Sequence, residues 1–361
     1  MPYQQYAAIL GPEERRWAHI QPWLQSKGYM LRPRFRVGWT PSWLDGTTVT
    51  TRKLGEDSLP HNKHACGLIM DAVRISDGRL VVLKRFELPA NGQTELEVNT
   101  ILSSEPLKND PRNPALPMLD VIYAPDQCFM VFPFGHSLYG MELDTIGEGL
   151  DFVEQTLEGL VFLHENRIAH RDCAITNIVG DSPRMYPRGI HLDGGGLDLR
   201  GKSLGHIRTR TQVGGMKYYF IDFGESIKFG PSDSTRIVVH SKASIAAPET
   251  ADLSLWPYDA FKPDIYTLGT TYKRALAEVY TSFDMLNPLL DAMTQRDPDA
   301  RPSAAEALEL YKNIKGSLSR TALHGRLHKR KDPPESSFKR VFFDCLHYTE
   351  QIAWAAQNLK W

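Results

Sequence analysis

The sequence predicts an α+β protein in which most strands precede most helices. Two strand-like runs, 68–73 and 80–86, flank Asp77-Gly78, and Asp-Gly between β-rich runs is a strong hairpin signal. Further strand-like runs lie within 118–132, and apolar residues with a helical period follow over residues 147–166. These observations predict a β-rich part followed by a mainly helical part.

Composition excludes several classes of protein. The 361 residues are 42% hydrophobic and 24% charged, with a net charge of -1, which is ordinary for a globular protein and gives no reason to expect a nucleic-acid partner. We expect no membrane span and a cytoplasmic or nuclear location, because no segment is apolar over the length a bilayer requires. No Cys-x-x-Cys pair is present, so neither a zinc site nor a disulfide framework is predicted from Cys66, Cys128, Cys173 and Cys345.

One ten-residue stretch, 168–177, has the pattern of a catalytic loop. It reads His170-Arg171-Asp172 and then, five residues after the Asp, Asn177. This spacing resembles the catalytic loop of protein kinases, in which the Asp meets the acceptor hydroxyl and the Asn holds a metal ion on the nucleotide. A surface turn with the same residues would be a solvated loop in most proteins. The interpretation therefore depends on partner motifs elsewhere in the chain.

A lysine motif lies upstream of this loop. The strand-like run 80–86 contains Val-Leu-Lys, which resembles the strand that carries the phosphate-binding lysine of kinases, so Lys84 is expected to bind the α- and β-phosphates. A helix over residues 94–102 follows. In the kinase arrangement a glutamate of this helix holds the lysine, and we expect Glu97, with Glu95 as the alternative.

Further motifs follow downstream in the kinase order. An apolar β-run ends in Asp222-Phe223-Gly224, where Asp222 is expected to chelate Mg²⁺. Ala247-Pro248-Glu249 then resembles the end of an activation segment. After it, Asp264 resembles the aspartate that braces the catalytic loop, and Arg301 resembles the arginine that pairs with Glu249.

Because all these motifs occur in one order over residues 62–312, the chain resembles the eukaryotic protein-kinase-like family. The resemblance implies a two-lobed fold, with a small β-rich N-lobe at about 61–133 and a larger, mainly helical C-lobe at about 136–312. ATP would bind at the hinge, where Pro133 keeps its carbonyl and Gly135 keeps its N–H. Residues 1–60 form an N-terminal extension.

Two segments depart from the usual kinase plan. An insert at about 180–218 precedes the Asp-Phe-Gly motif, and together with the Arg-Pro-Arg and Trp-x-Pro-Ser-Trp elements of the extension it resembles fungal protein-kinase-like proteins. A basic and amphipathic tail covers 313–361. Its basic run, 326–331, fits a solvated linker better than a nuclear-localisation or lipid-contact patch, and an amphipathic stripe is expected over 338–361.

The predicted function is transfer of the ATP γ-phosphoryl group to a Ser/Thr or Tyr hydroxyl of a protein substrate, with Mg²⁺. The expected phosphate loop is thin, since Gly67 is the one glycine of residues 62–69, and this favours a pseudokinase as the alternative. A small-molecule phosphotransferase is a second rival. Arg171 is expected to pair with a phosphorylated activation segment, and the candidate sites are Ser234, Thr235, Ser241 and Ser244.

Overall fold

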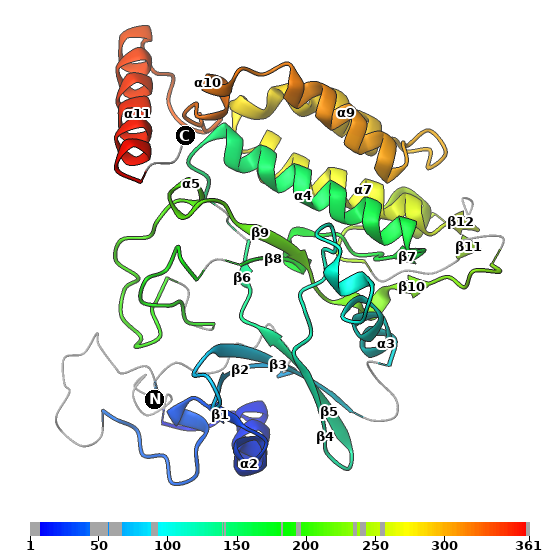
Figure 1. The fold of residues 1–361 in the computed structure, drawn as a ribbon, viewed down its shortest axis with the longest axis vertical. Coiled ribbons are helices and arrows are strands. Elements are labelled where there is room, and N and C mark those ends of the chain that lie inside the picture. The colour runs from blue at the N-terminus through cyan, green and yellow to red at the C-terminus, as the bar shows by residue number, and fades with distance from the viewer. Residues whose placement is uncertain are drawn as a thin grey trace. The chain divides into compact units, whose positions relative to one another are not determined.

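The computed structural model confirms an α+β architecture and divides the chain into two compact units (Figure 1). Unit 1 comprises Met1–Leu96, Pro117–Phe134 and Pro183–Arg208, and unit 2 comprises Glu97–Leu116, Gly135–Ser182 and Thr209–Trp361. The structure describes residues 8–43, 57, 67–87, 93–138, 140, 142–181, 183–192, 196–233, 237–238, 243–252 and 257–358.

The described part of unit 1 is built on a five-stranded antiparallel sheet of order β1-β2-β3-β5-β4. The predicted hairpin is present: β2 pairs with β3 across a turn in which Gly78 has a φ of 71°. Lys84 lies on β3, the middle strand, opposite Ile69 of β2 and Met130 of β5. The strands are β1 (Tyr29–Leu31), β2 (Ile69–Arg74), β3 (Leu80–Glu87), β4 (Asp120–Tyr123) and β5 (Gln127–Pro133).

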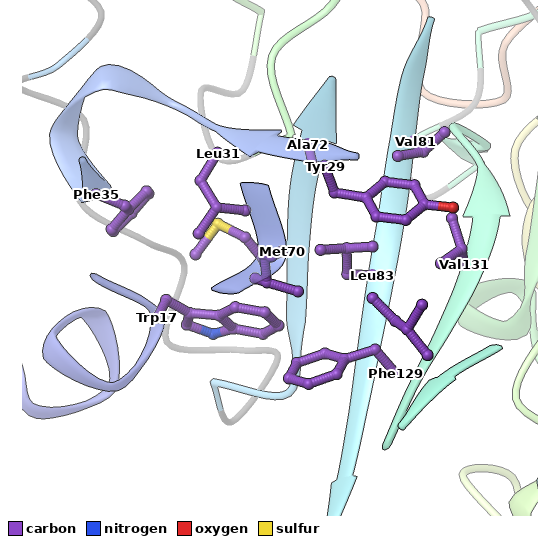
Figure 2. Packing of buried hydrophobic residues seen from close by; sticks show 12 residues of the cluster. Trp17, Tyr29, Leu31, Phe35, Met70, Ala72, Val81, Leu83, Phe129 and Val131 are labelled. Atoms are coloured by element: carbon purple, nitrogen blue, oxygen red, sulfur yellow. The ribbon is translucent and has the colours of Figure 1, made fainter. Parts of the chain in front are cut away.

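Helix α2 (Pro12–Ser26) covers one face of this sheet. Pro12 occupies the first turn, and the side chain of Glu14 accepts a hydrogen bond from the N–H of Gly11, which closes the helix start. Trp17 is fully buried and packs against Phe129 with ring centroids 5.7 Å apart (Figure 2). A separate N-terminal extension was predicted over residues 1–60, which contain α2 and β1. In the structure β1 is an edge strand of the sheet and α2 packs on it, so both belong to unit 1.

A buried arginine anchors the segment after β1. Arg34 lies in the short 3₁₀ helix η1 (Pro33–Phe35) and is 1% exposed. Its guanidinium donates to both carboxylate oxygens of Glu14, at 2.7 and 3.0 Å, and to the backbone oxygen of Asp57 at 3.1 Å. It also stacks over the ring of Trp39. A fully paired buried cation fixes this segment onto α2.

Unit 2 is organised around α4 (Ile146–Glu165), the predicted helix before the catalytic loop. Its N-cap, Thr145, accepts a hydrogen bond from the N–H of Glu148 at 3.2 Å. Two tyrosine hydroxyls connect neighbouring helices to α4. Tyr272 of α7 (Phe261–Tyr272) bonds Thr156 at 2.6 Å, and Tyr311 of α9 (Ala304–Gly316) donates to the backbone oxygen of Leu150 at 2.6 Å. Helices α4, α7 and α9 are therefore packed together in the core of unit 2.

The remaining elements of unit 2 are shorter, except for the last helix. Its described helical elements also include η4 (Leu107–Asn109), α5 (Arg210–Val213), α6 (Pro248–Ala251), α7 (Phe261–Tyr272), the π-helix η8 (Lys273–Ala277), η9 (Thr281–Leu286), α8 (Asn287–Met293), α9 (Ala304–Gly316), α10 (Arg320–Leu323) and α11 (Ser337–Asn358). Helix α3 (Gln93–Leu102) begins in unit 1 and ends in unit 2.

Short antiparallel strand pairs flank the predicted catalytic loop and the Asp-Phe-Gly motif of unit 2. The small sheets of this unit are β6-β8-β9, β7-β10 and β11-β12. Strands β8 and β9 flank the predicted insert and pair directly, with Ile178 opposite Phe220. The strands are β6 (His136–Ser137), β7 (Ile168–Ala169), β8 (Ile178–Asp181), β9 (Lys217–Phe220), β10 (Ile227–Lys228), β11 (Ile237–Val238) and β12 (Tyr258–Asp259).

The predicted insert divides between the units, because Pro183–Arg208 belongs to unit 1 while α5 and β9 belong to unit 2. The predicted amphipathic stripe of the tail lies on α11. Within the described ranges, no helix is both long enough and apolar enough to cross a membrane.

Candidate functional site

The predicted catalytic loop follows β7 and is braced by a buried aspartate. Asp264, in the first turn of α7, is fully buried and accepts the N–H of His170 at 2.9 Å and that of Arg171 at 2.6 Å. Its carboxylate also contacts the ring of His164 at 3.0 Å. Arg171 has a φ of 69°, a conformation that costs a non-glycine residue energy unless its surroundings hold it. Asp264 supplies that support, as predicted.

His170 links this loop to the strand that leads to Asp222. Its Nδ1 accepts the backbone N–H of Asp172 at 3.2 Å, so Nδ1 carries no proton, and Nε2–H donates to the backbone oxygen of Ile221 at 3.1 Å. Complete burial lowers the pKa of His170. A neutral imidazole is therefore built into the site as a structural link.

Asp172 is only 8% exposed, and its carboxylate accepts hydrogen bonds from Asn177 and Ser244. Asn177, at the end of the 3₁₀ turn η5 (Ile175–Asn177), donates its amide to Asp172 Oδ2 at 2.8 Å and to the backbone oxygen of Asp172 at 3.1 Å. Ser244 donates its N–H to Oδ1 at 2.9 Å and its hydroxyl to Oδ2 at 2.7 Å. Asp172 thus holds an aliphatic hydroxyl at the distance that general-base catalysis requires.

The Asp-Phe-Gly motif forms a short 3₁₀ turn, η6 (Phe223–Glu225). Asp222 precedes this turn in the left-handed region, with a φ of 63°, and Phe223 is buried. Asp222 and Gly224 are both exposed. Ser226, just after the turn, donates its hydroxyl to the backbone oxygen of His170 at 3.1 Å. Two contacts, through His170 and Ser226, therefore connect the loop of Asp172 with the turn of Asp222.

Two oxygen ligands suit the predicted magnesium ion. The donor hydrogens of the Asn177 amide point to Asp172, which leaves Oδ1 as the ligand atom, and Asp222 offers a carboxylate. Both are the hard oxygen donors that Mg²⁺ prefers, and Mg²⁺ sites on nucleotides use few protein ligands. The described residues contain no group of three or more His, Cys, Asp or Glu side chains arranged to hold a metal ion.

The side chain of Arg171 is a buried cation whose hydrogen-bonding capacity is only partly used. Its Nη1 donates to the backbone oxygen of Glu225 at 3.2 Å. Its Nε and Nη2 are buried and make no well-formed hydrogen bond with the described residues, although the hydroxyl of Tyr258 lies close to the guanidinium. Buried guanidinium donors without a partner are unfavourable, so this position favours an anion. Of the four candidate phosphorylation sites, Ser234, Thr235 and Ser241 lie outside the described residues.

The predicted pair of Glu249 and Arg301 is present and completely buried. Two bonds join the guanidinium to the carboxylate, at 2.6 and 2.7 Å, and neither side chain is exposed. Arg301 also donates to the backbone oxygens of Gln295, Lys262 and Arg296. Every guanidinium nitrogen is therefore engaged. The pair fixes the start of α6, which ends the predicted activation segment.

Unit 1 contains the predicted phosphate-binding lysine, paired with a glutamate of α3. Lys84 Nζ lies 2.7 Å from both carboxylate oxygens of Glu95, and the two side chains are 14% and 4% exposed. The prediction that Glu97 pairs with Lys84 was wrong, and the alternative, Glu95, is the partner. Glu95 shares the buried face of α3 with Val98 and Leu102, whereas Glu97 lies two positions further round the helix and is exposed.

Gly67, the glycine of the expected phosphate loop, is held by α2. Its carbonyl accepts the indole N–H of Trp17 at 2.8 Å, and its φ of 69° favours glycine. A Cβ at this position would lie 2.5 Å from the carboxylate of Glu13. Residues 62–66 of the expected loop lie outside the described residues. Here the structure indicates a packing role for Gly67.

The predicted hinge coincides with a passage of the chain between the units. Pro133 ends β5 opposite Val81 in unit 1, and unit 2 resumes at Gly135. Gly135 lies so close to Val179 of β8 that a Cβ would be 2.6 Å from its methyl group. Glycine is thus required here by close packing in unit 2.

The contact between Ser244 and Asp172 was missed by sequence reasoning, which treated Ser244 only as a phosphorylation candidate. Its one sequence signal is its position just before Ala247-Pro248-Glu249.

Comparison with models of known protein families finds none that matches the chain.

Proposed function

We propose that this protein is a protein kinase, which uses Mg²⁺ and ATP to phosphorylate a hydroxyl group of a protein substrate. The observation that carries the proposal is the environment of Asp172. Its carboxylate accepts the hydroxyl of Ser244 at 2.7 Å while Asn177 fixes the same carboxylate oxygen at 2.8 Å. A substrate hydroxyl that replaced Ser244 would be oriented in the same way and could pass its proton to Asp172.

In this proposal, unit 1 and unit 2 each contribute side chains to nucleotide binding. Lys84, oriented by Glu95, would contact phosphate oxygens, and Asn177 and Asp222 would hold Mg²⁺. ATP supplies the transferable phosphoryl group when it is bound, and Mg²⁺ offsets its negative charge. Because this chemistry depends on positioning and electrostatics, loss of either metal ligand should remove nearly all turnover.

A two-lobed kinase fold is part of the proposal. Three observations support it: a five-stranded antiparallel sheet with Lys84 on its middle strand, a mainly helical unit that carries Asp172 and Asp222, and a passage between the units at Phe134 and Gly135. The buried pair of Glu249 and Arg301 favours a protein substrate over a small molecule, because in the kinases that this chain resembles the pair shapes a platform for a protein substrate.

The direct test is intact-mass spectrometry of phosphatase-treated protein after incubation with Mg²⁺, ATP and a generic acceptor such as casein. The active protein should add mass increments of phosphate to itself or to the acceptor, and Asp172→Asn should add none. Asp291→Asn is the matched control, because Asp291 is an exposed aspartate of α8 with a 71% exposed side chain. Equal phosphate incorporation by Asp172→Asn and the control would refute the assignment of Asp172.

A pseudokinase is the second candidate, and one observation favours it. The expected phosphate loop, residues 62–69, has a single glycine, Gly67, and the indole of Trp17 on α2 binds its carbonyl. Weak phosphate binding would follow from such a loop. Phosphate transfer separates the two candidates, because a kinase transfers phosphate and a pseudokinase does not. The melting temperature on addition of Mg²⁺ and ATP then separates a pseudokinase that binds nucleotide, which melts at a higher temperature, from one that binds none.

A further inference from the structure

Helix α11 is attached to unit 2 by its polar face. Gln351 donates to the carboxylate of Asp144 at 2.7 Å, and the hydroxyl of Tyr348 donates to the backbone oxygen of Thr321 at 3.0 Å. His347 bonds the backbone oxygen of His324 at 3.1 Å, and Asp344 accepts the guanidinium of Arg326 at 2.8 Å. The side of α11 that faces the rest of unit 2 is therefore fixed by hydrogen bonds and an ion pair.

The opposite side of α11 is apolar and exposed. We call it the outer stripe. Phe338, Phe342 and Leu346 follow one another at intervals of four residues, and Val341 and Ile352 flank them on the same face of the helix. Their exposed fractions are 80% for Phe338, 62% for Val341, 56% for Phe342, 45% for Leu346 and 51% for Ile352. Cys345 lies in the middle of the stripe as an exposed free thiol. Figure 1 shows α11 beside α10, at one side of unit 2.

This arrangement reverses the usual one, in which an amphipathic helix turns its apolar face inward. Isolated apolar residues on a surface need no explanation, but a continuous stripe marks a surface that another molecule covers. We infer that the outer stripe binds the outer stripe of a second copy of this chain, with the two α11 helices antiparallel and Cys345 of each copy near the two-fold axis.

The charges beside the stripe favour a second copy. Lys339 and Glu350 lie on one flank, six residues before and five residues after Cys345, and both are exposed. Neither side chain has an ion-pair partner within the described ranges. In an antiparallel helix pair like flanks meet, so Lys339 of each copy would face Glu350 of the other. The same register sets Phe338 opposite Ile352, each seven residues from Cys345.

The charge of α11 argues against a lipid surface as the occupant. A helix that binds anionic lipid carries an excess of basic residues on its polar face. Helix α11 contains two basic residues, Lys339 and Arg340, and two acidic ones, Asp344 and Glu350. This balance of charge is compatible with pairing between two copies of the helix.

The test is sedimentation velocity of the full chain over a range of concentrations. The protein should form a reversible dimer, and Phe342→Glu should raise the dimer dissociation constant about a hundredfold or more, because two copies of a central apolar residue are lost together. Leu310→Glu is the matched control, since Leu310 is an apolar residue of α9 with 41% exposure and lies outside the stripe. Circular dichroism of each variant verifies its fold.

Two further variants identify the register. Lys339→Glu should weaken the dimer, and the double variant Lys339→Glu, Glu350→Lys should restore it. Mild oxidation should link the parent chain through Cys345, and Cys345→Ser should abolish the link. A parent chain that stays monomeric at all concentrations, or a dimer that Phe342→Glu leaves unchanged, would overturn the inference. A monomer that binds phosphatidylserine vesicles through Phe342 would assign the stripe to a membrane instead. None of these readouts depends on kinase activity.

Discussion

Replacement of Asp264 by Asn tests whether one buried carboxylate sets the conformation of the catalytic loop. The carboxylate accepts two backbone N–H groups, those of His170 at 2.9 Å and Arg171 at 2.6 Å, through different oxygens. An asparagine has one oxygen and one NH₂ group. In either orientation the NH₂ group therefore faces a backbone N–H, so one of the two bonds is lost.

The magnitude follows from these contacts. Loss of a hydrogen bond to a charged group costs about 1.5–3 kcal/mol, and the surviving bond to a neutral amide is weaker by about 1 kcal/mol. The left-handed conformation of Arg171, with a φ of 69°, also loses its support. A total of about 3 kcal/mol corresponds to a factor of about 150 in the equilibrium for local opening.

The assay is native-state hydrogen exchange read at the amides of His170 and Arg171. We expect exchange of both amides to accelerate about a hundredfold in Asp264→Asn, with the Asp172-dependent phosphate transfer falling at least tenfold. Asp291→Asn serves as the matched control, because its side chain is 71% exposed and bonds a lysine at the surface. If both variants exchange these amides at the parent rate, Asp264 does not hold the loop and the reasoning fails.

Four other perturbations test separate contacts. Glu95→Gln should raise the KM for ATP about ten- to a hundredfold, because Lys84 loses a charged partner. Glu97→Gln is the matched control and should change the KM little, and equal effects of the two variants in a kinase assay would contradict the pairing. Arg301→Met should lower the free energy of unfolding in urea by about 3–5 kcal/mol, since it leaves a fully buried carboxylate unpaired, and a loss below about 1 kcal/mol would argue against that burial. Ser244→Ala should lower the KM for the acceptor roughly tenfold with an unchanged kcat, because the serine hydroxyl competes for Asp172; a fall in kcat instead would show that Ser244 positions the base. Burial lowers the pKa of His136 to about 4, so between about pH 6.5 and pH 4 the unfolded chain binds a proton at this residue that the folded chain does not bind. The free energy of unfolding should therefore fall by about 1–2 kcal/mol from pH 7 to pH 5. A urea midpoint that is constant or higher at pH 5 would contradict this sign.

Short-range patterns predicted the parts of the molecule that neighbouring residues determine. The hairpin around Asp77-Gly78 follows from turn chemistry. The bracing role of Asp264 and the pair of Glu249 with Arg301 join residues 93 and 52 positions apart, and they were predicted only through the resemblance to kinase motifs. The choice between Glu95 and Glu97 failed because two glutamates two positions apart point to different sides of a helix. Only the packing of α3 decides which side is buried.

Two features could not be predicted because they depend on contacts between distant segments. Strand β1 has three residues, too few to show a periodic pattern, and it pairs with β2 more than forty positions along the chain. The bond from Ser244 to Asp172 joins residues 72 positions apart, and nothing in the local sequence of either residue requires it. Both are set by tertiary packing.

Strand β1 has a practical consequence for how the protein can be shortened. A fragment that began at residue 61 would retain the motifs but lack β1 and α2, and β2 would become the outermost strand, with unpaired N–H and C=O groups. It would also expose the apolar face that Trp17 covers, including Phe129. An open sheet edge beside bare apolar surface is a template for aggregation. An expressible fragment therefore has to begin before Pro12.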